Sequence, residues 1–345
     1  MKINKIKKHT LEKCYAIANI TYQNKEHIVV AAEKTDDCLL FDIDGNFIET
    51  IWKGPSGTMS IVPLEDADGC FLATKKMYSP NDSKEAEIVL VKHDETGWKT
   101  RTIATVPYAH RFDVLKTDDK RYLICATIKS NYEYRDDWRF PGQYLAVELP
   151  KVLDDTFVVE PQLIIPDLLK NHGYIHRNDA NGDYSVIACE NGVYEIHPPT
   201  KENSDWAVKK LIEDPTSDIA FVDYDEDGKE EMLSLAPFHG NTIRIYKLDS
   251  NNEYKLDYEF EDKHEFLHSI WAGTLYNKPY SIISNRKGQS RDLMGIFYSD
   301  NSYKMELLEK ECGSTNVLVY YKDGKPKLVS TNREIDEIAF YDIEE

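Results

Sequence analysis

The sequence lacks several features that would each indicate a particular class of protein. It has no run of about 18 apolar residues, so we expect neither a membrane-spanning helix nor a membrane partner. Residues 1–8 contain no apolar stretch of the signal-peptide type, so we expect a cytoplasmic protein. The six cysteines lie far apart with no CxxC pair, which argues against a four-cysteine zinc site. Basic residues are few, 42 against 61 acidic ones, and the net charge of −19 argues against nucleic-acid binding.

Short runs rich in β-branched and aromatic residues dominate the chain. Residues 27–32 and 122–127 are examples, and turns such as Asp44-Gly45 and Asp227-Gly228 lie between runs of this kind. Such runs, joined by Asx-Gly turns, are typical of β-hairpins. No long helical periodicity competes with them, so the sequence predicts an all-β fold.

One pattern, two apolar strands around a polar turn, recurs seven times. Successive repeats are about 50 residues apart, a spacing typical of β-propellers. The predicted starts are Ala16, Met59, His110, His176, Ser217, His268 and Thr315. We therefore expect a single domain over residues 1–345, a monomeric seven-bladed β-propeller of four-stranded antiparallel blades.

The last repeat has room for only three strands before Glu345. Residues 2–14 precede the first repeat and begin with the strand-like positions Ile3 and Ile6. We predict that this segment is the missing outer strand of the last blade. The alternative is a frayed terminus.

Propeller geometry predicts that polar residues gather at one mouth of the central channel, because the first strand of a blade starts where the second strand ends. The residues expected at this mouth are His110, Arg111, His176, Arg177, His268, His239, Arg286, Asn332 and Arg333. An insertion at residues 130–142 would rise over it with Tyr132, Tyr134, Arg135 and Trp138. Arg binds carboxylates and His exchanges protons near neutral pH, so the set favours a small anionic or oxygen-rich ligand. The alternatives are solvated strand ends and a loop that merely covers a blade edge.

Two groups of residues are candidate metal ligands. Asp223, Asp225 and Asp227 alternate ahead of a Gly turn and are followed by Glu231, a pattern of oxygen ligands that suits a structural Ca²⁺. The alternative is an Asp-rich turn without a metal. The histidines at the mouth would suit Zn²⁺ or Mn²⁺, although no HxH or HExxH spacing demands a metal.

Several segments resemble known families. Residues 221–233 resemble the DxDxDG element of FG-GAP/VCBS repeats, which build propellers. Residues 266–273, 285–288 and 331–338 resemble the propeller domain of aldos-2-ulose dehydratase-like proteins. The general layout is also similar to propeller polysaccharide lyases of the rhamnose–glucuronate and ulvan types. The resemblance implies elimination of water or an alcohol from a sugar. In the dehydratase, cupin domains follow the propeller, and this sequence does not contain them. An isomerase step assigned to those domains is therefore not implied.

The expected chemistry is β-elimination by a carbon–oxygen lyase on a small uronic-acid-containing or keto sugar. His110, Tyr132 or Tyr134 would take the proton next to the carbonyl group, while His176 and His268 would act as acid or orienting groups. Arg111, Arg177, Arg286 and Arg333 would hold the anionic group. The alternative is a non-catalytic propeller that binds a carbohydrate or a protein partner.

Overall fold

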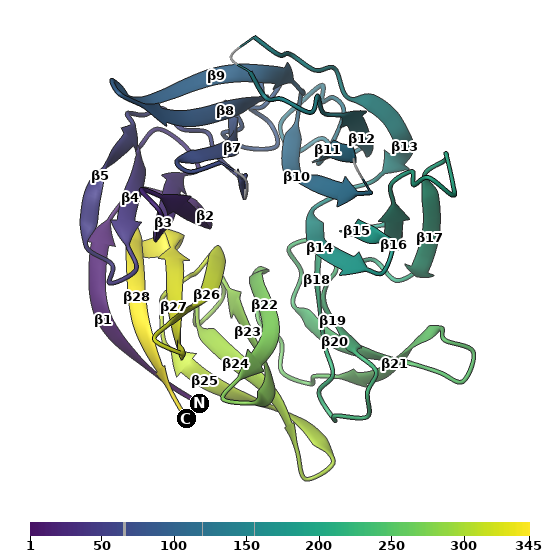
Figure 1. Ribbon diagram of the computed structural model, residues 1–345. Helices are drawn as coiled ribbons and strands as arrows, with labels where there is room; N and C mark the ends of the chain where they lie inside the picture. Colours follow the sequence, from purple (N-terminus) through teal and green to yellow (C-terminus); the bar gives the residue numbers. More distant parts are fainter. Residues whose placement is uncertain (65–66, 119, 155) are drawn as a thin grey trace.

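Seven four-stranded antiparallel sheets form a ring of blades around one axis (Figure 1). The computed structural model describes residues 1–64, 67–118, 120–154 and 156–345. Within these ranges no helix is long and apolar enough to cross a membrane. The helical content of the described residues is one 3₁₀ turn, Arg333–Ile335. The all-β, seven-bladed prediction is confirmed.

In each of the first six blades, four consecutive strands run from the inner to the outer edge of the sheet. Their bounds, blade by blade, are β2 (Cys14–Tyr22), β3 (Lys25–Ala32), β4 (Cys38–Asp42), β5 (Phe47–Trp52); β6 (Ile61–Pro63), β7 (Cys70–Lys75), β8 (Glu87–Asp94), β9 (Gly97–Thr105); β10 (Ala109–Thr117), β11 (Lys120–Thr127), β12 (Gly142–Glu148), β13 (Gln162–Leu168); β14 (Gly173–Asp179), β15 (Gly182–Cys189), β16 (Gly192–His197), β17 (Ala207–Ile212); β18 (Asp218–Val222), β19 (Glu231–Ala236), β20 (Thr242–Leu248), β21 (Tyr254–Glu259); and β22 (Leu267–Leu275), β23 (Lys278–Asn285), β24 (Leu293–Ser299), β25 (Ser302–Glu309).

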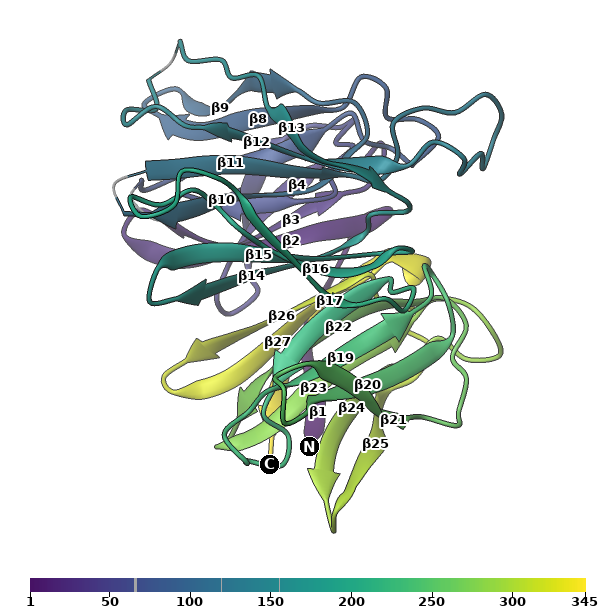
Figure 2. The same cartoon turned by 90° about the vertical axis from the view of Figure 1, so that its right-hand side faces the viewer.

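The seventh blade joins the two ends of the chain. It contains β26 (Asn316–Lys322), β27 (Lys325–Asn332) and β28 (Glu337–Glu344), and its outer strand is β1 (Lys2–Thr10). β1 pairs antiparallel with β28, from Lys2 opposite Glu344 to Thr10 opposite Glu337. The N- and C-termini therefore lie side by side at the outer edge of the ring (Figures 1 and 2). The predicted closing strand is confirmed.

The hydrophobic core is divided among the blade interfaces. Among the described residues, clusters of buried apolar side chains lie between neighbouring blades, for example Phe41 of blade one with Phe340 of blade seven. The alternating strands supply apolar side chains to both faces of each sheet, because each sheet is covered by a neighbour on both sides. This packing leaves the inner-strand residues that face the axis free to line a channel.

Candidate functional site

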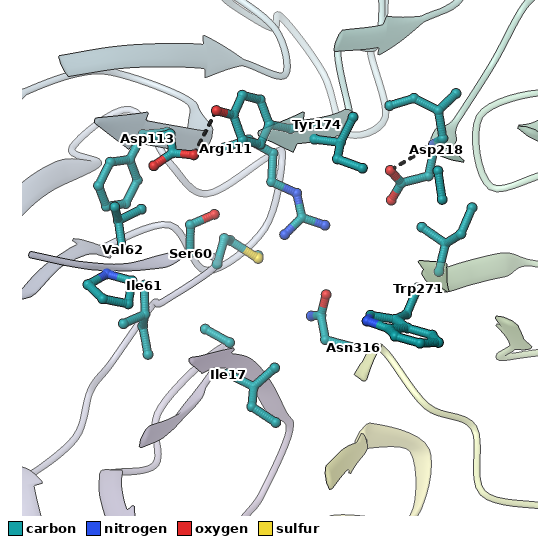
Figure 3. Close-up of a pocket in the computed structure, with 18 of the residues that line it drawn as sticks. Ile17, Ser60, Ile61, Val62, Arg111, Asp113, Tyr174, Asp218, Trp271 and Asn316 are labelled. Atoms are coloured by element: carbon teal, nitrogen blue, oxygen red, sulfur yellow. Dashed lines mark hydrogen bonds between the residues drawn. The ribbon is translucent and has the colours of Figure 1, made fainter. Parts of the chain in front are cut away.

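The axis of the ring holds a cavity of about 520 Å³ that the inner strands of all seven blades line. This cavity, the central channel, is drawn in Figure 3. Apolar residues such as Ile17, Ile61 and Ile270 form much of its wall. The chemistry of the channel is defined by polar groups from Arg111, Asp113, Tyr174, Asp218 and Asn316. A cavity of this size, largely apolar with a few convergent polar groups, is typical of a small-molecule site.

Arg111 is the side chain that extends furthest into the middle of the drawn channel (Figure 3). It lies on β10 between the buried residues His110 and Phe112, so strand alternation turns it toward the axis. Its guanidinium group makes no hydrogen bond or ion pair with any residue that the structure describes. Every other charged side chain in the channel is engaged. An unpaired guanidinium in a half-buried channel is a binding group for a carboxylate or another anion.

Asp218 lies on the opposite side of the channel from Asp113 (Figure 3). It is buried, with a relative exposure of 5%, and its Oδ1 accepts a hydrogen bond of 3.1 Å from the Ile219 amide. Desolvation raises the pKa of Asp218 to about 7, although the positive charge of Arg111 acts in the other direction. A carboxyl group with this pKa can accept or donate a proton at neutral pH.

Tyr174, Asp113 and His176 form a hydrogen-bonded chain at the channel wall. The Tyr174 hydroxyl donates to Asp113 Oδ2 over 2.7 Å, and His176 Nδ1 donates to the same oxygen over 2.9 Å. The hydrogen bond to Asp113 raises the pKa of His176 to about 9, so this imidazole is protonated at neutral pH. Burial raises the pKa of Tyr174 well above its usual value, so Tyr174 keeps its proton and is available as an acid.

Four histidines pack against one another at the mouth where the inner strands begin. This histidine layer consists of His110, His172, His239 and His268. The centroid of the His172 ring lies 4.7 Å from that of His110, 5.0 Å from that of His239 and 5.2 Å from that of His268. Desolvation lowers the pKa of all four, to about 3 for His172, so the layer is uncharged at neutral pH.

β-Bulges direct several residues toward this mouth. In β10 the register shifts between Ala109 and Arg111, which leaves His110 as the extra residue of its strand. Tyr15 is the extra residue of β2 in the same way, and the shift in β22 spans His268. A bulge re-aims the side chain that it carries. Tyr15 and Met59 are also buried, at 2% and 3% exposure, so the layer closes the channel at this mouth.

The hydrogen bonds define the tautomers of two of these histidines. His172 Nδ1 lies 3.1 Å from the Ser217 carbonyl oxygen, and His268 Nδ1 lies 2.8 Å from that of Thr315. Because a carbonyl only accepts, both Nδ1 atoms carry the proton. His268 Nε2 then accepts from the Tyr15 hydroxyl over 3.2 Å. The Nε2 atoms of His172 and His239 are buried and have no hydrogen-bond partner among the described residues.

The structure brings together three of the four predicted mouth histidines, and Arg111 follows His110 on β10. The prediction is wrong for His176 and Arg177, which lie in the middle of β14. This strand begins at Gly173, three residues before the predicted start at His176. A Cβ at Gly173 would lie 2.7 Å from the Ser217 oxygen of the next blade, so only glycine allows the blades to approach there. His172, which was not among the predicted mouth residues, takes the place of His176 in the layer. Arg177 instead forms an ion pair with Glu230.

The other predicted binding residues lie outside the central channel. Arg286 and Arg333 share the carboxylate of Glu334, and Arg333 also pairs with Glu33. Asn332 is buried and donates to Glu337 over 3.1 Å. These arginines are therefore already neutralised.

The insertion at residues 130–142 contacts the histidine layer indirectly. Trp138 packs against Phe238, with ring centroids 5.0 Å apart, and Phe238 stacks on His239. Tyr132 packs edge-on against Tyr108. Tyr134 and the Arg135 side chain are exposed, at 57% and 90%. The insertion thus supports the layer from outside and supplies no side chain to the central channel.

The acidic residues predicted to bind Ca²⁺ surround a lysine. This acidic loop comprises Asp223, Asp225, Asp227 and Glu231, and the Lys247 ammonium group contacts three of them. It forms an ion pair with Asp225, and it lies 3.7 Å from Asp227 and 3.5 Å from Glu231. Burial lowers the pKa of Lys247, but its contacts with these carboxylates outweigh burial and raise it overall. A built-in cation therefore balances part of the charge that a metal ion would neutralise.

Sequence reasoning missed Asp113, Tyr174 and Asp218 as channel residues. Asp113 and Asp218 follow predicted blade starts by three residues and by one residue, and Tyr174 precedes a predicted start by two. Once the strand starts are known, the alternation of side chains along the inner strands indicates that these residues face the channel. No model of a known protein family matches the chain, and a search of curated proteins finds no match.

Proposed function

We propose that this chain is a carbon–oxygen lyase that acts by β-elimination on a small uronic-acid-containing or keto sugar, and that the reaction takes place in the central channel. One observation carries the proposal. The guanidinium of Arg111, which pairs with none of the described residues, shares the channel with an Asp218 carboxyl group of pKa about 7 and with the protonated phenol of Tyr174. These groups correspond to the anion holder, the base and the acid that the reaction needs. The resemblance to dehydratase-like and lyase propellers leads to the same reaction class.

In the proposed reaction Arg111 binds the carboxylate or ketone of the sugar and stabilises the enolate that develops there. The Asp218 carboxylate takes the proton from the carbon next to that group. Tyr174 donates its proton to the departing oxygen as the carbon–oxygen bond breaks and the carbon–carbon double bond forms. Asp218 then returns its proton to solvent, and Tyr174 regains one. Trp271 offers a flat apolar surface beside the ring of the sugar.

The histidine layer fits a transition-metal ion, Zn²⁺ or Mn²⁺. Ligand nitrogens of His172, His239 and His268 lie within 4.8 Å of one another. Nitrogens on one tetrahedral Zn²⁺ are about 3.4 Å apart, so the rings would need to close by roughly 1 Å. Two of the Nε2 atoms have no competing partner in the described part of the chain, and the third would exchange its hydrogen bond from Tyr15. Bound there, the ion would join blades four, five and six and add positive charge above Arg111.

A non-catalytic propeller is the second candidate. Arg111, Trp271 and Asn316 alone would bind an acidic sugar without transforming it. The two candidates differ in what Asp218 does, because a binding site needs no group that exchanges protons.

The test is ultraviolet absorbance from a new conjugated carbon–carbon double bond, measured with glucuronate-containing oligosaccharides and keto sugars, with and without Zn²⁺ or Mn²⁺. We expect Asp218→Asn to reduce turnover about 10²–10⁴-fold and Arg111→Ala about 10²–10³-fold. The matched controls Asp300→Asn and Arg291→Ala change exposed ion pairs and should leave turnover unchanged. No absorbance change with any sugar, together with binding that Arg111→Ala abolishes, would replace the lyase by the non-catalytic candidate.

A further inference from the structure

A second cavity continues the central channel toward the opposite mouth. Its volume is also about 520 Å³, and Val62, Pro63 and Asp113 line both cavities. Some of the additional lining residues come next along the same inner strands, such as Val114 on β10 and His176 on β14, and two come from the second strands, Arg121 on β11 and Asp183 on β15. Because the histidine layer closes the other end, a ligand held at Arg111 extends toward this second cavity.

The walls of the second cavity are of two kinds. Val62, Pro63 and Leu64 form an apolar side, while His176, Asn178 and Asp183 present polar groups. His176 is held in place from both ring nitrogens, since Nε2 lies 3.4 Å from Asp183 Oδ1 in addition to the Nδ1 bond to Asp113. Asp183 also accepts a hydrogen bond of 2.8 Å from the Lys116 amide, which ties blade four to blade three. One apolar and one hydrogen-bonding wall suit a sugar ring, which has an apolar face and a rim of hydroxyl groups.

The lining of the second cavity also contains charged groups of both signs. Lys116, Arg121 and the protonated His176 are positive, whereas Asp113 and Asp183 are negative. Together these groups can donate hydrogen bonds to the hydroxyl groups of a sugar and accept hydrogen bonds from them.

We propose that the second cavity binds the next sugar of a chain whose acidic sugar is held at Arg111. The substrate is then an acidic oligosaccharide of two or more units rather than a single sugar, and Asn178 and His176 select for it. This inference depends on the proposed ligand class at Arg111.

The test is calorimetric binding of D-glucuronic acid and of glucuronate-containing di- and tetrasaccharides to the Asp218→Asn variant, which keeps Arg111 but should not consume the ligand. We expect the disaccharide to bind at least tenfold more tightly than glucuronic acid. A further Asn178→Trp substitution fills the second cavity, so it should reduce disaccharide affinity to that of the single sugar and leave glucuronic acid binding unchanged. Asn178→Ala should cause a smaller, roughly threefold loss. Asn251→Trp, in an exposed outer turn, is the matched control and should change nothing.

The outcomes separate this inference from the proposed function. Equal affinities for one and two sugars, unaffected by Asn178→Trp in a protein with an unchanged melting temperature, would overturn the second subsite and leave the Arg111 site standing. Absence of binding by every member of the series would overturn both.

Discussion

The histidine layer and the acidic loop are both clusters of potential metal ligands, yet their polar atoms are satisfied in different ways. In the acidic loop, Lys247 supplies a positive charge from the neighbouring strand β20. In the histidine layer, desolvation keeps the rings neutral, and two buried Nε2 atoms have no partner among the described residues. Whether such a cluster needs an ion therefore depends on the partners that the fold brings to it, and the residue types of the cluster alone do not decide this.

Removing the Lys247 ammonium group from the acidic loop should change the free energy of unfolding more than the other substitutions considered below. Lys247→Met leaves the carboxylates of the acidic loop uncompensated, including Glu231, which is only 1% exposed. Breaking a partly buried charge cluster in this way should lower the free energy of unfolding by about 3 kcal/mol, measured by urea denaturation. Millimolar Ca²⁺ should restore more stability to this variant than it adds to the wild type. Lys304→Met, which removes an exposed lysine–aspartate pair, is the control. Equal stabilisation of the Lys247→Met variant and the wild type by Ca²⁺ would show that Lys247 does not substitute for the ion.

Added Zn²⁺ should test the histidine layer, the region without an internal cation. If the histidine layer binds Zn²⁺, the ion at 100 times its dissociation constant should stabilise the wild type by about 2.7 kcal/mol. His172→Ala should abolish this gain, while His197→Ala should keep it, because His197 lies in an outer strand and pairs with Glu195. The readout is the melting temperature, with bound zinc counted by elemental analysis. Zinc stabilisation that survives His172→Ala would rule out the layer as the site.

The pH dependence should have opposite signs in the two regions. Burial lowers the pKa of His172 from 6.5 to about 3, so the unfolded chain binds the extra proton and stability falls as the pH decreases below 6.5, by about 2 kcal/mol at pH 5. Burial raises the pKa of Glu231 from 4.5 to about 7, so here the folded chain binds the extra proton and stability falls as the pH increases from 4.5 to 7.

Substitutions should separate these two contributions. His172→Gln should reduce the loss of stability on acidification, and Glu231→Gln should reduce the loss on going from pH 5 to pH 7. The measurement is urea unfolding of each variant and the wild type at several pH values. Parallel pH profiles for all three proteins would contradict the assignment of these protons.

Much of the candidate site followed from the repeat pattern alone. The positions of His110, Arg111, His239 and His268 were predicted because each lies next to a strand start or end that the hydrophobic pattern marks clearly. His172 was missed because the fourth blade begins at Gly173, and the need for glycine there comes from the backbone of blade five. The roles of Asp218 and Tyr174 could not be predicted either, since they depend on burial and on partners from other blades.

The number of blades, their order and the closure by residues 2–14 can be predicted from the sequence, because alternating apolar residues and Asx-Gly turns are local signals. The pairing of the polar groups, by contrast, is a property of the folded ring. Arg286 and Arg333 meet Glu334, and Lys247 enters the acidic loop, whereas Arg111 meets no partner among the residues that the structure describes. The physical reason is that charge balance depends on distances between blades. Those distances are set when the ring closes and leave no trace in the spacing of residues along the chain.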